Sequence, residues 1–163
     1  MRNWLALGLV LGAAIVAGPV AAAPPSLAGV WTLVETRQRM TDGSIRPDPD
    51  LGAHPKGYMI YDPSGRMCTV FSAGDLPAWA GARPTDAEAR AALDHMVSYC
   101  ARYEIDEARA VVVFHIEVAP SAASAGGTRE RRFELKGDEL TLYPMPLPAG
   151  VTAWSVHLRR ARP

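Results

Sequence analysis

The sequence lacks concentrated charge of either sign. Its 163 residues hold 17 Lys and Arg against 17 Asp and Glu, which gives a formal net charge of +0 at pH 7. No basic run precedes the short RRAR stretch at residues 159–162. Proteins that bind nucleic acid neutralise phosphates with clustered Lys and Arg, so no nucleic-acid partner is expected here.

The sequence also lacks the common motifs of catalysis and metal binding. It has no Gly-x-Ser-x-Gly elbow and no phosphate-binding glycine loop, and no pair of carboxylates stands out from ordinary strand charges. Its four histidines, His54, His95, His115 and His157, are far apart and none has the spacing of a metal-ligand pair. We therefore predict no metal site, no cofactor and no assigned catalytic residue.

The N-terminus has the layout of a secretory signal peptide. One Arg is followed by an uncharged apolar run and then by small residues around position 22. We predict a signal peptide at residues 1–22, a mature domain at residues 23–163, a periplasmic or secreted location and no stable membrane insertion after cleavage. An uncleaved membrane anchor is the alternative, because the uncharged run at residues 3–23 is near the length of a short membrane span.

The remaining residues, about 140, fit one domain with a sizeable core. Most of its segments alternate apolar and polar residues or are rich in β-branched and aromatic residues, as strands are. A helix is expected only at residues 84–97, where Thr85 and Glu88 form a capping box. The expected strands lie at residues 27–35, 58–61, 66–71, 100–106, 110–119, 128–136, 140–143 and 153–160.

Short turns join several of these strands. Asp62-Pro63-Ser64-Gly65 places its residues as a type I β-turn favours, so the flanking strands form a hairpin. About eight strands with one short helix predict an all-β, up-and-down antiparallel β-barrel, because closure removes the exposed edges of an open sheet. A β-sandwich is the alternative.

Several stretches together resemble the lipocalin-like domain family, whose members are small calycin-type β-barrels. The resemblance covers residues 27–160 and rests on the order and spacing of its parts. It implies an up-and-down barrel with a central apolar cavity, and hence a site for a small molecule. Ala101 departs from the glycine usual in the family's Tyr-x-Gly-x-Tyr pattern. The stretches are LAGVW at 27–31, GYMIYDPSGRM at 57–67, YCARYEID at 99–106, His115, and Arg131 before FELKGDEL at 133–140.

Cys68 and Cys100 are the only cysteines. In an exported protein two cysteines more often form a disulfide than remain free. Two buried free thiols are the alternative, and a catalytic thiol would need a nearby base that the sequence does not place beside either residue.

A polar group is expected in the barrel lumen. Alternation in the strand at residues 110–119 puts His115 and Glu117 on one face and Phe114 on the other. The family resemblance pairs this His with an Arg on the next strand, and Arg131 fits because it shares its face with Phe133. The cluster would orient a ligand carboxylate or enolate. The alternative is a structural ion pair whose members bond only to each other and bind no ligand.

The function expected from this site is binding of a small apolar or amphipathic molecule in the barrel. His115, Glu117 and Arg131 are the expected polar anchor. An enzyme of the isomerase or cyclase type, in which His115 moves a proton with Glu104 or Glu117, is one alternative. A structural envelope module with a filled barrel is another. The expected apolar lining consists of Phe71, Tyr103, Phe114 and Phe133.

Overall fold

The computed structural model describes residues 26–122 and 124–162. The predicted signal peptide and its cleavage point lie outside these residues. Within the described ranges, no helix has the length and apolar character needed to cross a membrane.

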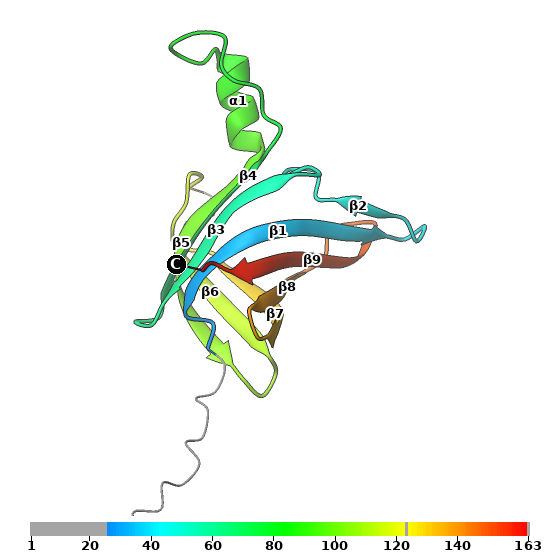
Figure 1. Ribbon diagram of the computed structural model, residues 1–163, viewed down its shortest axis with the longest axis vertical. Coiled ribbons are helices and arrows are strands. Elements are labelled where there is room, and N and C mark those ends of the chain that lie inside the picture. Colours follow the sequence, from blue (N-terminus) through cyan, green and yellow to red (C-terminus); the bar gives the residue numbers. More distant parts are fainter. Residues whose placement is uncertain (1–25, 123, 163) are drawn as a thin grey trace, which may run out of the picture.

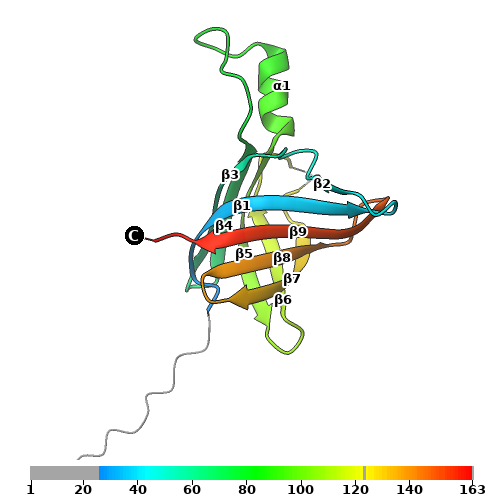
Figure 2. The ribbon, with the colours of Figure 1, turned by 45° about the vertical axis from the view of Figure 1, so that its right-hand side comes forward.

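The described chain forms a closed antiparallel barrel (Figures 1 and 2). Each strand from β3 onward pairs with the next, and β1 pairs with both β3 and β9, which closes a barrel of eight strands. The short β2 pairs beside the far half of β1. The expected barrel is confirmed and the sandwich is wrong. The elements are β1 (Gly29–Met40), β2 (Ile45–Pro47), β3 (Pro55–Asp62), β4 (Arg66–Ala73), α1 (Asp86–Asp94), β5 (Met96–Asp106), β6 (Val111–Val118), β7 (Thr128–Lys136), β8 (Glu139–Met145) and β9 (Val151–Arg160).

The hairpin of β3 and β4 follows its turn residues. The amide of Gly65 donates to the carbonyl of Asp62 at 3.1 Å, and Asp62 pairs directly with Arg66. Gly57 has a φ of +140°, and a Cβ atom there would overlap the carbonyl oxygen of Val70 on the neighbouring strand. The position therefore requires glycine for two reasons, its backbone conformation and the close approach of β4.

A bulge in β1 divides the inner wall of the barrel into two parts. Trp31 and Leu33 are buried on the inner face, and the register then shifts between Leu33 and Glu35. Beyond the shift the buried residues are Thr36 and Gln38. An extra residue in a strand reverses which side chains point inward, so polar side chains enter the interior in the second half of β1.

One end of the barrel is closed by an aromatic side chain and a guanidinium. The Arg160 guanidinium carbon lies 4.1 Å from the centroid of the Trp31 ring, and Arg160 Nη1 donates to the Ala28 carbonyl at 2.8 Å. Trp31 Nε1 donates to the Leu27 carbonyl at 2.8 Å. Stacking of a cation on an indole and paired polar groups seal this end.

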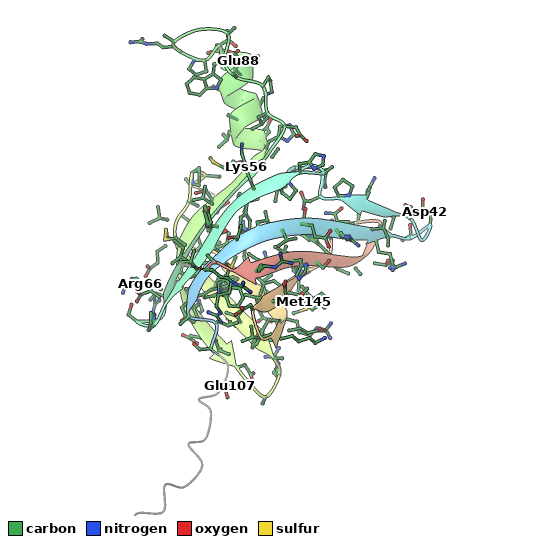
Figure 3. All side chains as sticks on the ribbon, viewed as in Figure 1. Asp42, Lys56, Arg66, Glu88, Glu107 and Met145 are labelled. Carbon is green, nitrogen blue, oxygen red and sulfur yellow. A yellow bond between two sulfur atoms is a disulfide. The ribbon has the colours of Figure 1, made fainter. Side chains whose placement is uncertain are left out.

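The segment between β4 and β5 stands clear of the barrel (Figure 3, near Glu88). Its helix α1 begins after Thr85, where the predicted capping box is present: the Glu88 amide donates to Thr85 Oγ1, and the Thr85 amide donates to the Glu88 carboxylate. The helix is shorter than predicted, because Met96 and Val97 belong to β5. No residue of α1 is buried.

A disulfide joins Cys68 and Cys100, with their Cα atoms 4.1 Å apart. The two cysteines occupy directly paired positions on β4 and β5. The disulfide hypothesis is confirmed, and the bond ties the β3–β4 hairpin to the strand that follows the helix.

Candidate binding cavity

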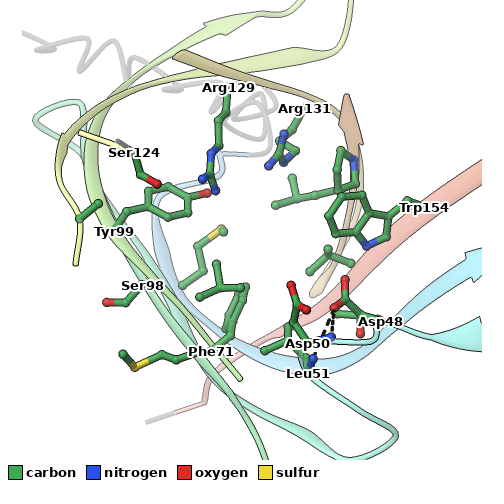
Figure 4. A pocket seen from close by; sticks show the side chains of 18 of the residues that line it. Asp48, Asp50, Leu51, Phe71, Ser98, Tyr99, Ser124, Arg129, Arg131 and Trp154 are labelled. Atoms are coloured by element: carbon green, nitrogen blue, oxygen red, sulfur yellow. Dashed lines mark hydrogen bonds between the residues drawn. The ribbon is translucent and has the colours of Figure 1, made fainter. Parts of the chain in front are cut away.

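A cavity of about 550 Å³ lies inside the barrel. The strands contribute inner-face residues to it. Its rim comes from residues 48, 50 and 51, from residues 119–121 and 124, from the C-terminal end of β8 with Pro146, and from the end of α1. This volume is typical of sites that hold a small organic molecule. Figure 4 shows the side chains around it.

Two guanidinium groups project into the cavity from β7. Exposed and half-buried residues alternate along this strand, and Arg131 pairs with Val112, a fully buried residue of β6. Arg129 and Arg131 therefore share the inner face with Phe133. Arg131 Nη1 donates to the carbonyls of Glu130 at 2.9 Å and Met145 at 3.4 Å.

The two guanidiniums lack an internal counter-charge. Among the described residues, no carboxylate lies within salt-bridge distance of Arg129 or Arg131. Burial lowers the pKa of Arg131, and the neighbouring charge of Arg129 adds to this effect. The free energy of this arrangement falls when an anion enters the cavity.

Tyrosines lie beside the guanidiniums. The Arg129 guanidinium carbon is 4.9 Å from the centroid of the Tyr99 ring. Burial raises the pKa of Tyr99, while the charges of Arg131 and Arg129 oppose that shift. The hydroxyl of Tyr61 is buried and has no hydrogen-bond partner among the described residues, and burial raises its pKa well above the ordinary value. Both phenols therefore remain neutral hydrogen-bond donors at physiological pH.

The opposite side of the cavity carries acidic groups (Figure 4). Asp48 is only 4% exposed, and one of its carboxylate oxygens accepts from the amides of Asp50 at 2.9 Å and Leu51 at 3.3 Å. Asp50 is exposed at the rim, and its carbonyl lies 2.8 Å from His95 Nδ1 after α1. Burial raises the pKa of Asp48.

Apolar side chains form most of the remaining wall. They come from strands on all sides of the barrel, so a ligand would meet a hydrophobic surface between the cationic and the acidic sides. These residues include Leu51, Met59, Phe71, Leu142, Pro144 and Val156.

Two of the predicted anchor residues lie on the outer surface. His115 Nε2 is 3.7 Å from the exposed Glu104, and Glu117 lies between Arg66 at 3.7 Å and Arg102 at 3.2 Å. Since Arg131 faces inward opposite Val112, His115 must face outward, three residues further along β6. The expected convergence of His115, Glu117 and Arg131 is wrong, because one strand cannot direct both Phe114 and His115 into the lumen.

The predicted aromatic residues divide between the cavity and the core. Phe71 lines the cavity. Phe114 is fully buried against Tyr61, with ring centroids 6.2 Å apart, and the Tyr103 hydroxyl donates to the Asp62 carbonyl at 3.0 Å. Phe133 packs against the core. These three residues fill the barrel beyond the cavity and do not line it.

The sequence interpretation missed several residues that line the cavity. Arg129 is two residues from Arg131 on the same strand, so the alternation that selected Arg131 also indicates Arg129. Asp48 and Asp50 lie in a loop, where no periodic pattern predicts direction. Trp154 belongs to a strand in which burial does not alternate cleanly.

Metal ligands do not gather in the described residues, where no three His, Cys, Asp or Glu side chains lie close enough to hold an ion.

The chain is similar to one protein family and to several solved structures. A family model described as a lipocalin-like domain matches residues 28–161. No curated protein matches the chain. A crystal structure of an uncharacterised protein from Bacteroides eggerthii is similar at 11% identity and a TM-score of 0.44, covering 83% of this chain and all of that one. A mutant of the fluorescent protein UnaG is similar at 12% identity and a TM-score of 0.38, covering 84% of this chain and 97% of that one.

Proposed function

Since the chain belongs to the lipocalin-like domain family, we propose that it binds one small amphipathic molecule in its barrel, with an anionic group of that molecule against Arg129 and Arg131. The apolar part of the molecule would lie against Phe71, Met59 and Leu142, which line the same cavity.

The observation that carries this proposal is the pair of guanidiniums without a carboxylate partner in a largely apolar cavity. A carboxylate accepts two parallel hydrogen bonds from a guanidinium, and such charge-assisted bonds are stronger than neutral ones. Tyr99 supplies a further neutral donor beside Arg129. Because both arginines lie on the inner face of one strand, a bound anion can contact both at once.

The other candidate functions have less support. The enzyme alternative requires His115 in the cavity, but His115 contacts Glu104 and Thr128 on the outer wall. A structural module with a filled barrel requires no cavity, whereas this barrel contains one of about 550 Å³. Ligand binding accounts for both the cavity and the charged arginines that line it.

We place the binding site outside the cytoplasm. The disulfide between Cys68 and Cys100 supports this placement, because such bonds persist in oxidising compartments and are rare in the cytosol. The signal-like N-terminus supports it as well.

Displacement of a fluorescent fatty acid from the purified protein tests the proposal. We expect saturable binding of one molecule per chain, competed by alkanoates and only weakly by alkanols of equal length. The variant Leu142→Trp places a larger side chain in the cavity from β8 and should lose binding, and circular dichroism checks that the variant keeps its fold. Equal competition by alkanols and alkanoates, or binding that Leu142→Trp leaves intact, would refute the proposal. Native mass spectrometry of protein from its own host would name the ligand.

A further inference from the structure

The cavity has charges of opposite sign on its two sides. We infer that it selects a molecule with an anionic group at one end, an apolar middle and a protonated amine at the other end. This inference rests on the proposed function and names the chemical class of its ligand. Figure 4 shows Arg129 and Arg131 on one side of the open space and Asp48 and Asp50 on the other.

Asp48 lies on the inner face at the end of β2. The preceding residue Pro47 pairs with Arg37, so Asp48 lies beside Thr36 and on the same side of the sheet. Both are buried, at 4% and 3% exposure, and both line the cavity. A buried carboxylate is therefore part of the cavity wall.

The acidic side also has unused hydrogen-bonding groups. In the described part of the chain, Thr36 Oγ1 and Trp154 Nε1 are buried atoms without a hydrogen-bond partner, and both residues line the cavity. In Figure 4 the indole nitrogen of Trp154 points toward the side occupied by Asp48 and Asp50. A buried polar atom without a partner is costly. Thr36 Oγ1 can accept a hydrogen bond from a ligand ammonium group, whereas Trp154 Nε1 only donates and does not recognise that group.

The charges of the acidic side are also unpaired. Within the described ranges, no Lys, Arg or His nitrogen lies within salt-bridge distance of the carboxylate of Asp48 or Asp50. The hydrogen bonds that Asp48 accepts from backbone amides involve only one of its two carboxylate oxygens. A ligand ammonium group has three donors and would supply the missing charge.

The arginines do not neutralise these acids in place of a ligand. An ion pair across the cavity would close it, and no such pair is formed. The two sides therefore stay charged and separated by apolar residues such as Phe71 and Leu142. A molecule with one charge would satisfy one side and leave a buried carboxylate unpaired on the other.

Two matched series of ligands test the inference. Alkanoates from octanoate to hexadecanoate are compared with the ω-aminoalkanoates of the same lengths, by competition against the fluorescent fatty acid. We expect a chain length at which the ω-amino compound binds at least as tightly as the plain alkanoate, although its ammonium group favours water. At that length Asp50→Asn and Asp48→Asn should each weaken the ω-amino compound by roughly tenfold and leave the alkanoate within about threefold.

Asp75→Asn is the control, because Asp75 is an exposed acid outside the cavity and its loss removes the same charge. Two results would overturn the inference and leave the proposed function standing. In the first, alkanoates bind but the ω-amino compound competes at no chain length; in the second, all three variants weaken binding of the ω-amino compound equally. Failure of every alkanoate to bind would instead overturn the proposed function. Asparagine keeps the amide-accepting oxygen of Asp48, so the loop is expected to fold in both cavity variants.

Discussion

Replacement of Arg131 by Gln provides the sharpest test of the anion site, because the strand offers a matched control one residue away. Arg131 faces the cavity, while Arg132 faces outward with its guanidinium carbon 5.0 Å from the centroid of the Tyr143 ring. Arg131→Gln and Arg132→Gln remove the same charge from the same strand. Only the first removes it from the proposed ligand contact.

The size of the effect follows from the surroundings of Arg131. Two unit charges about 4 Å apart attract by about 4 kcal/mol at the effective dielectric of a partly buried site. About half of this is offset because the ligand carboxylate loses hydration, and Arg129 remains to hold the anion. A loss of about 2 kcal/mol corresponds to a Kd about thirtyfold weaker. An alkanol of equal length should bind both variants alike.

Isothermal titration calorimetry of the unchanged protein and both variants, each with an alkanoate and the matching alkanol, measures the six affinities needed. The expected result is a loss confined to one combination, the alkanoate with Arg131→Gln. An equal loss in Arg132→Gln would show that the effect comes from overall charge, and no loss in Arg131→Gln would show that the guanidinium does not hold the ligand. Either result would refute the reasoning.

Three further predictions concern stability. Gly57→Ala should destabilise the fold by about 2 to 3 kcal/mol, against about 1 kcal/mol for Gly43→Ala, because both glycines have positive φ but only the first has no room for a Cβ; urea unfolding compares them. Reduction of the Cys68–Cys100 bond, which spans 32 residues, should cost about 3 to 4 kcal/mol and lower the Tm of thermal unfolding. The raised pKa of Asp48 gives stability that is full below its ordinary value of 3.8 and lost as pH rises through the raised value, so Asp48→Asn should flatten this part of the pH–stability curve.

Local signals in the sequence were sufficient for the fold. The turn at Asp62 and the capping box at Thr85 both lie where the sequence places them. Each signal depends on residues close together in the chain, so no tertiary information is needed to recognise it. The alternation of side chains along β7 also predicted correctly that Arg131 rather than Arg132 faces inward.

The site required information that a periodic pattern does not contain. Alternation tells which residues of one strand share a face, but it does not tell which face is the inner one. For β6 that choice was decided by a resemblance, which set His115 inward, whereas the register against β7 sets Phe114 inward. Asp48 and Asp50 enter the cavity through a loop, and a loop has no alternation at all.

The cavity also depends on how deep in the barrel each inward-facing residue lies, which alternation along a strand does not tell. On β7 the inner residues change from Leu135 and Phe133 near the closed end to Arg131 and Arg129 toward the rim. On β1 the same change, from Leu33 to Thr36, occurs only because the bulge shifts the register between Leu33 and Glu35.

Without that bulge, a strict alternation from Trp31 and Leu33 would direct Glu35 and Arg37 inward and Thr36 outward. Glu35 would then place a carboxylate inside the barrel, where it could pair with the guanidiniums of β7 and neutralise them. The register shift instead keeps Glu35 outside, where it contacts Arg37 at 2.7 Å. One extra residue in β1 therefore helps to keep the positive side of the cavity available for an anion from solution.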